Sequence, residues 1–148
     1  MKYEEERKKA VSYCGAYCHR CDWYLGKIKE PADQLLALIK KRPELKGWIQ
    51  EECDSNNFVQ GLEWLSRSGF CTYTCKAGSG WKDCPVRKCC QERGISFCFE
   101  CEEFPCKKWG KWPFDQIKID NLREIKEIGV EPWIKKQWEH KGGHENAL

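Results

Sequence analysis

Residues 96–106, Ser-Phe-Cys-Phe-Glu-Cys-Glu-Glu-Phe-Pro-Cys, place Cys98, Cys101 and Cys106 in a Cys-x2-Cys-x4-Cys pattern. A Cys-x2-Cys turn lets two sulfurs converge on one ion while the intervening backbone folds around them. Zinc needs four ligands at tetrahedral corners, and one loop rarely supplies all of them. The stretch therefore predicts part of a metal site that is completed by cysteines from elsewhere in the chain.

Working outward, the chain holds three further groups of cysteines at short spacings. They are Cys14, Cys18 and Cys21 (Cys-x3-Cys-x2-Cys), Cys71 and Cys75 (Cys-x3-Cys), and Cys84 and Cys89 (Cys-x4-Cys). Four such groups suggest at least two ions, and these cysteines together with Cys98, Cys101 and Cys106 are the candidate metal ligands. The spacing leaves open which sulfurs share an ion.

The expected grouping of the ligands divides the cysteines between two sites. One site is expected from Cys75, Cys84 and Cys89, with Cys71 as a further candidate. A second site is expected from Cys98, Cys101 and Cys106 together with the loop of Cys14, Cys18 and Cys21. Cys53 and Cys90 stand apart from the groups and are interpreted as ordinary buried thiols.

Twelve cysteines among 148 residues indicate metal thiolates or disulfides, with free buried thiols as a third reading. Disulfides persist in oxidising compartments, and residues 1–7 show no apolar region of a secretory signal. A cytoplasmic metal-binding protein is therefore favoured, although intracellular disulfide-rich proteins of hyperthermophiles remain an alternative. The sequence contains no run of about eighteen apolar residues, the length that a membrane-spanning helix needs, so no membrane helix is expected.

The donor set favours zinc, with an iron–sulfur cluster and hence a redox protein as the alternative. Cysteine ligation alone does not separate the two. Cys84 and Cys106 adjoin Pro85 and Pro105 at expected helix starts, where the helix dipole stabilises thiolates. His19 could add a ligand or lie on the surface.

The charge of the chain gives little support for binding nucleic acid. Net charge is +3, from 26 basic and 23 acidic residues, and metal-bound thiolates would lower it. Residues 107–112 interleave lysine and tryptophan, which can stack bases, but tryptophans of a small core explain them more simply. An unidentified protein partner is the more natural expectation.

The common catalytic motifs that do not depend on cysteine are not apparent in the sequence. There is no Ser-His-Asp set, P-loop or dinucleotide fingerprint. Catalytic zinc usually keeps an open position and uses histidine or carboxylate ligands, whereas this chain is rich in cysteine and poor in histidine. A structural-zinc interaction module is therefore favoured, and a zinc- or thiol-dependent enzyme remains the less favoured alternative.

Apolar periodicity and proline positions predict a small α-rich metal-bound domain with little or no sheet, in which helices flank an irregular Cys-rich region. Helices are expected over 31–42, 44–51, 57–67 and 85–94, from Pro105, over 121–129 and from Pro132. Ser55 or Asn56 is expected to cap the third helix, with Gly69 closing it, and Asn121 with Glu124 is expected to cap the sixth. One domain is expected over 1–148, with residues 1–12 and 141–148 as flexible tails.

The chain resembles a prokaryotic family of Cys-rich proteins, domain of unknown function 3795. The resemblance rests on residues 13–21, 61–65, 84–89, 94–106 and 121–130, and spans roughly 13–138. It implies a stand-alone metal-binding domain, with zinc as the metal, and no established activity. The chain departs from the family pattern at Cys71-Thr72-Tyr73-Thr74-Cys75, where the family tends to have Cys-x2-Cys, so Cys71 is the ligand that the resemblance supports least.

Overall fold

A computed structural model describes residues 2–67 and 71–139, with side chains from residue 5 onward. Within these ranges the chain is helical and forms no β-strand, only an isolated antiparallel bridge between Val11 and Tyr17. The α-helices are α1 (Lys2–Lys9), α2 (Lys29–Lys41), α3 (Glu44–Glu52), α4 (Ser55–Arg67), α5 (Pro85–Arg93), α6 (Asp115–Ile128) and α7 (Val130–Glu139). The expected α-rich fold with a Cys-rich irregular region is confirmed.

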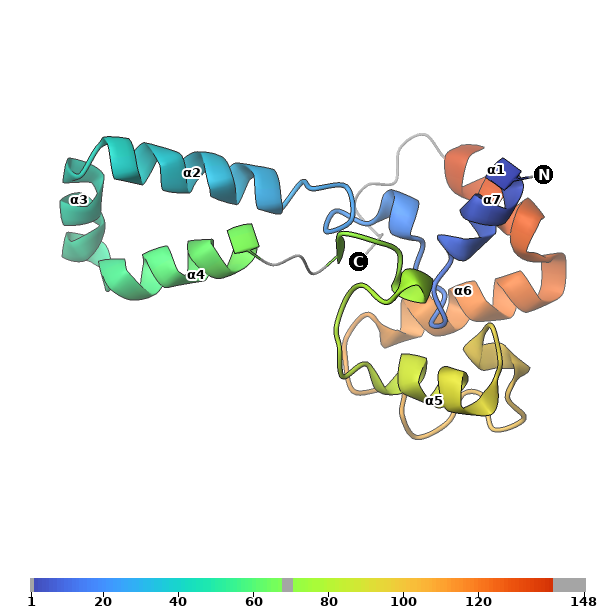
Figure 1. The fold of residues 1–148 in the computed structure, drawn as a ribbon. Helices are drawn as coiled ribbons and strands as arrows, with labels where there is room; N and C mark the ends of the chain where they lie inside the picture. The colour runs from blue at the N-terminus through green and yellow to red at the C-terminus, as the bar shows by residue number, and fades with distance from the viewer. Residues whose placement is uncertain (1, 68–70, 140–148) are drawn as a thin grey trace.

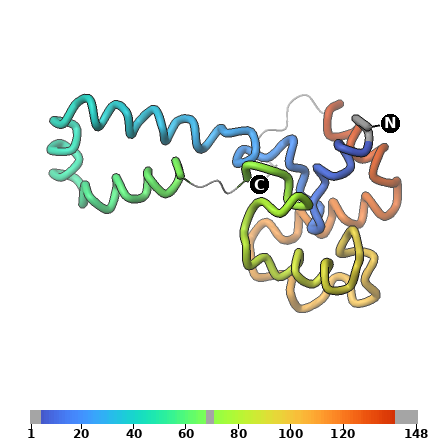
Figure 2. The backbone as a smooth tube through the Cα atoms, in the orientation of Figure 1, coloured from blue at the N-terminus to red at the C-terminus, as the bar shows by residue number. Residues whose placement is uncertain are grey.

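Helices α2, α3 and α4 form an arm, residues 29–67, that projects from a lobe built by the rest of the described chain (Figure 1). The tube view shows α2 and α4 running antiparallel, with α3 across the far end (Figure 2). On α2, Ala32, Leu36 and Ile39 recur at helical spacing and are buried. None of the described helices combines the length and apolar character that crossing a membrane requires.

The starts and stops of the arm helices follow local sequence signals. Pro43 follows the end of α2, as expected. At the start of α4 the cap is Asp54, whose Oδ1 accepts the Asn57 N–H at 2.8 Å. The expected cap at Ser55 or Asn56 is wrong because the Ser55 hydroxyl donates to Gln50 Oε1 at 2.8 Å instead. Gly69 lies outside the described residues.

The lobe has an apolar core built from both ends of the chain. Val11 near the N-terminus, Leu122 and Ile125 on α6, and Trp133 and Ile134 on α7 are almost completely buried. The expectation of a flexible tail over residues 1–12 is therefore corrected: Lys2–Lys9 is helical, and residues 10–12 are buried in the core. The expected tail over 141–148 lies outside the described residues.

Two helix boundaries near the C-terminus differ from expectation. No helix begins at Pro105, where the Phe104–Pro105 peptide is cis and the chain continues in turns. Helix α6 begins at Asp115, so Asn121 lies inside it and does not cap a helix. The Asn121 side chain instead donates a hydrogen bond to the Gly15 carbonyl at 3.1 Å and joins α6 to the first cysteine loop.

Asp115 organises the turn that precedes α6. Its Oδ2 accepts hydrogen bonds from the backbone N–H groups of Gly110, Lys111 and Trp112 at 3.0, 3.0 and 3.2 Å, and the residue is buried. Sequence periodicity did not mark this residue because it lies before the apolar stripe of the helix.

Replacing Asp115 with alanine is expected to lower the free energy of unfolding by about 2–3 kcal/mol, because three N–H donors lose their acceptor. Chemical denaturation of Asp115→Ala measures this loss. Asp120→Ala is the matched control on the same helix, since Asp120 is exposed and pairs with Arg123 at the surface, and it should change stability by less than about 0.5 kcal/mol. Equal effects of the two variants would contradict the role given to Asp115.

Candidate metal centre

Two Cys-x2-Cys segments fold into the same kind of turn. Residues Cys18–Arg20 and Cys98–Glu100 each form a short 3-10 helix that is preceded and followed by extended backbone. In both, the N–H of the last cysteine donates to the carbonyl of the first, Cys21 to Cys18 at 3.0 Å and Cys101 to Cys98 at 3.2 Å. Each turn therefore carries one cysteine at each end, as a metal half-site requires.

Both turns are fixed to the same N-terminal segment. The Cys18 N–H donates to the Ala10 carbonyl at 2.8 Å, and the Cys98 N–H donates to the Tyr13 carbonyl at 2.9 Å. Gly15 lets this segment approach α6: its φ is +80°, and a Cβ there would lie 3.0 Å from both Leu122 Cγ and the Lys118 carbonyl. The positions of the cysteines thus depend on the buried core of the lobe.

Six cysteines that interact electrostatically with one another form the N-terminal thiol cluster. Its members are Cys14, Cys18, Cys21, Cys71, Cys75 and Cys84. They come from the first turn and from the segment that follows the arm, so the chain enters and leaves the arm beside this cluster. Cys75 opens a third 3-10 turn, Cys75–Ala77, that ends at Gly78 with φ +95°.

Hydrogen bonds to sulfur distinguish the members of this cluster. The Cys71 thiol, together with the backbone N–H groups of Tyr24 and Trp23, lowers the pKa of Cys21 to about 6. The same bond raises the pKa of Cys71. Burial raises the pKa of Cys18, although the Cys75 N–H donates to it, and burial raises the pKa of Cys75 to about 11. Cys21 is therefore the thiol most readily converted to the thiolate, the form that binds metal.

Five cysteines around a small pocket form the C-terminal thiol cluster. They are Cys89, Cys90, Cys98, Cys101 and Cys106, and all five line the pocket. The Cys90 thiol, with help from Trp109, lowers the pKa of Cys98 to about 7, and the pKa of Cys90 is raised by the same contact. Cys90 and Cys98 are both buried, whereas the other three are partly accessible.

Positively charged and N–H groups surround the sulfurs of the C-terminal thiol cluster. Arg93 Nη1 donates to Cys101 Sγ at 3.1 Å, and Lys108 Nζ donates to Cys89 Sγ at 3.4 Å. The indole N–H of Trp109 is buried without a well-aligned hydrogen bond to any described residue, and it lies close enough to Cys98 to lower the pKa of that thiol. Such donors stabilise thiolates and the negative charge of a metal–thiolate centre.

Lys76 lies between the two clusters. Its Nζ stands 3.8 Å from the ring centroid of Phe97 and 5.6 Å from that of Tyr13, which is cation–π geometry. It interacts with Cys75 and Cys18 in one cluster and with Cys90 in the other, while burial lowers its pKa. One cation therefore acts on both sets of sulfurs.

The chemistry of these clusters fits thiolate ligation, but the sulfurs are not gathered into a finished site. All twelve cysteines are free thiols. Among residues 2–67 and 71–139, no three histidine, cysteine, aspartate or glutamate side chains are grouped tightly enough to hold a metal ion. Two pairs of thiols instead lie close enough to change the pKa of each other, Cys21 with Cys71 and Cys90 with Cys98. A metal ion would replace these thiol protons and draw in further sulfurs by side-chain rotation.

The ten candidate ligands all lie in the two clusters, but their grouping differs from the expected one. Cys71 and Cys75 contact the first turn, and Cys89 lies with Cys98, Cys101 and Cys106. Cys90 is buried as expected but lies against Cys98, so the sequence missed its place in the cluster. Its position beside Cys89 on one helix was the available signal.

Two other expectations concern Cys53 and His19. Cys53 is exposed at the end of α3, so its interpretation as a buried thiol is wrong. The His19 ring lies between those of Tyr17 and Tyr24, at centroid distances of 5.4 and 5.5 Å, and desolvation lowers its pKa. Its ring contacts in the structure are thus with aromatic side chains.

Comparison with known proteins gives one family match. A family model described as "Protein of unknown function (DUF3795)" matches residues 10–111. This range contains all twelve cysteines and the whole arm, and it ends before α6. No curated protein and no solved structure matches the chain.

Proposed function

The chain belongs to the DUF3795 family of proteins of unknown function, and we propose from its own residues that it binds zinc at two structural thiolate centres and acts as an interaction module. The first centre would use Cys18, Cys21, Cys71 and Cys75, with Cys14 and Cys84 beside them. The second would use Cys89, Cys98, Cys101 and Cys106, with Cys90 beside Cys98.

One observation carries this proposal: two Cys-x2-Cys turns of the same geometry each face a thiol from another segment of the chain. Cys21 meets Cys71, and Cys98 meets Cys90 on α5. Thiols from a second segment that meet a Cys-x2-Cys turn are typical of metal sites made from two half-sites. The N–H donors at Cys18, Cys21 and Cys98 supply the outer hydrogen bonds that such ligands need.

Zinc is favoured over an iron–sulfur cluster by the space at the second centre. The free space among its five cysteines holds about one water-sized sphere, which suits a single ion better than a cluster that also contains inorganic sulfide. Four thiolates around Zn²⁺ carry a net charge of about −2, and Arg93 and Lys108 supply the opposite charge.

A structural role agrees with the surroundings of the two centres. Residues 71–84 and 94–114 contain little helix, so the centres would hold together segments that the apolar core alone does not fix. Structural zinc in this position stabilises loops that present a surface to a partner.

The proposal predicts about two zinc ions per chain, the number that two four-thiolate centres bind. Elemental analysis and an optical spectrum of protein purified without oxygen measure this. Cys21→Ser and Cys98→Ser should each lose about one ion, because each removes one ligand from a different centre, and the double variant should lose both. Cys53→Ser is the matched control and should keep both ions, since Cys53 is exposed on the arm.

Iron with inorganic sulfide and a broad band near roughly 400 nm would overturn the assignment of zinc in favour of a redox protein. Equal partial losses of zinc in every Cys→Ser variant, Cys53→Ser included, would overturn the division into two centres.

A further inference from the structure

The arm has one apolar face that the described chain leaves uncovered. On α2, Leu35 and Leu38 each precede an inward-facing residue, Leu36 or Ile39, and are therefore turned about 100° to one side of it. On α4, Phe58 is turned to the same side of the pair, because rotations of equal sense on antiparallel helices lead to one face. We call Leu35, Leu38 and Phe58 the apolar face.

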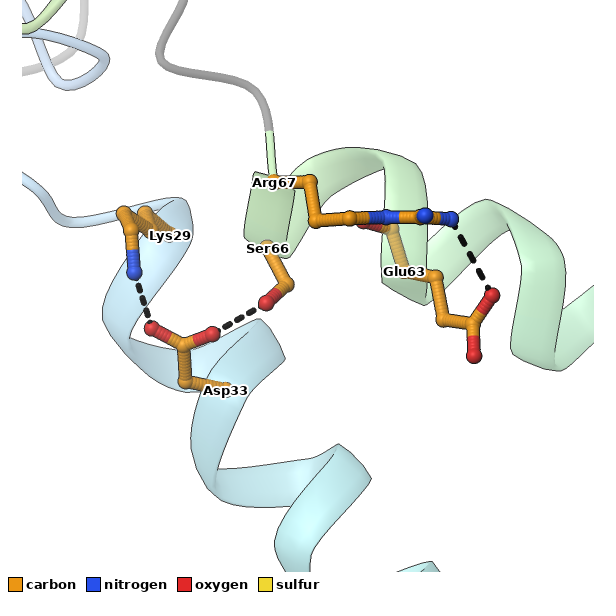
Figure 3. A network of polar contacts seen from close by, with 5 residues as sticks. All are labelled: Lys29, Asp33, Glu63, Ser66 and Arg67. Carbon is orange, nitrogen blue, oxygen red and sulfur yellow. Dashed lines mark hydrogen bonds and ion pairs between the residues drawn. The ribbon is translucent and has the colours of Figure 1, made fainter.

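The opposite face of the arm is polar and is internally bonded. Asp33 on α2 accepts hydrogen bonds from Lys29 and from Ser66 on α4, and Arg67 Nη2 bonds Glu63 at 3.2 Å (Figure 3). The Ser66–Asp33 bond joins the two helices, whereas the other two bonds pair charges within α2 and within α4. The two faces of the arm therefore differ in chemistry. One is apolar, and the other carries polar side chains that bond to one another.

The apolar face leaves three large side chains partly exposed to water. Leu35, Leu38 and Phe58 expose 37, 50 and 38 % of their area. A two-helix arm is one layer thick, and an amphipathic helix pair needs a second layer to bury its apolar side. Residues 140–148 contain only two apolar side chains, Ala147 and Leu148, too few to form that layer.

The charges of the arm suit a copy of itself. Residues 29–67 contain nearly equal numbers of basic and acidic side chains, so the arm offers no strong field to a polyanion or a charged membrane. At the far end of the arm, basic and acidic side chains lie in two different places. Exposed Lys40, Lys41 and Arg42 lie at one end of α3, and exposed Glu51, Glu52 and Asp54 lie at the other.

We propose that the apolar face docks on the same face of a second copy of this chain, and that the two arms form a four-helix bundle. A two-fold axis along the arms places α2 of one copy against α4 of the other. It also brings the basic corner of each copy next to the acidic corner of its partner, where opposite charges attract. The inference concerns the arm alone and does not depend on metal binding.

The size of the face sets the strength of this association. Helices of 13 residues are about 20 Å long and pack about 10 Å apart, so contact of the two faces removes on the order of 800 Å² from water. Stable interfaces bury about 1,200 Å² or more. The dimer is therefore weak, with a Kd on the order of 10–100 µM.

Sedimentation equilibrium of the full chain in reducing buffer tests the proposal between about 5 and 500 µM, a range that brackets the expected Kd. The mass should rise from 17.5 kDa toward twice that value. Leu38→Glu and Phe58→Glu should keep the protein monomeric across the range. Ala37→Glu is the matched control, since Ala37 is exposed on the polar side of α2, and it should leave the dimer intact. Circular dichroism checks that each variant is folded.

A charge exchange tests the two-fold arrangement. Lys40→Glu with Lys41→Glu, and Glu51→Lys with Glu52→Lys, should each weaken self-association, whereas an equimolar mixture of the two double variants should dimerise again. A wild-type chain that stays monomeric to 500 µM would overturn the proposal, as would an Ala37→Glu variant as impaired as Leu38→Glu. A mixture no better than its components would overturn the pairing of the corners.

Discussion

Removal of the two proposed zinc ions by a chelator is expected to unfold the Cys-rich segments of the lobe. Structural zinc contributes on the order of 10 kcal/mol of apparent folding free energy in small metal domains, which is comparable to the total stability of a typical domain, about 5–15 kcal/mol. Residues 71–106 contain a single α-helix, α5. Val86 and Phe97 pack in the core, but loss of the proposed ions would leave the loops around them without their cross-links. Near-ultraviolet circular dichroism should lose its tryptophan signal, and the melting midpoint should fall steeply.

The experiment needs a reductant throughout, so that the released thiols do not form disulfides. Adding zinc back should restore the signal, and Cys53→Ser should respond as the unaltered chain does. Complete removal of the metal with an unchanged melting curve would contradict a structural role for the ions.

The second large effect is expected in the apolar core at Trp133. Its side chain is completely buried and lies edge-on to Tyr17, with ring centroids 5.9 Å apart. Trp133→Ala should lower the free energy of unfolding by about 3–5 kcal/mol because it leaves a large cavity. For a chain of this size that corresponds to a drop of roughly 10 °C in Tm.

Trp133→Phe is the control for this prediction. The Trp133 indole N–H is buried and forms no hydrogen bond to the described residues, so its removal breaks none, and phenylalanine retains most of the apolar volume. This variant should lose less than about 1.5 kcal/mol. Denaturant unfolding of both variants under the same metal-loaded conditions measures the difference. Equal losses of unfolding free energy would contradict the view that the buried volume of the Trp133 side chain is what stabilises the core.

Local signals in the sequence were sufficient for most helices of the arm and lobe. Pro43 and Pro85 mark a helix end and a helix start whose causes lie within one turn of the chain. The helix-start predictions that were wrong depend on contacts that the local pattern does not show. Asn121 resembles a helix cap, but its amide is engaged by the carbonyl of Gly15 far away in sequence. Asp115, which does organise a helix start, bonds residues before it and carries no apolar pattern.

The identity of the candidate ligands was also readable from spacing, since a Cys-x2-Cys turn is local. Their grouping was not, because it depends on which segments the core brings together. The bonds from Cys18 to Ala10 and from Cys98 to Tyr13 decide where the two turns lie. Cys71 then reaches Cys21 because the arm returns the chain to the point where it left.

The arm and the lobe differ in how far apart in sequence their contacting residues lie. The arm is made of consecutive helices, whereas the lobe joins Gly15 to Asn121 and Tyr17 to Trp133. During synthesis the arm can therefore assemble as soon as Arg67 leaves the ribosome. The cysteines near the N-terminus must wait for α6 and α7, and until then their thiols are open to oxidants and to unspecific metal binding.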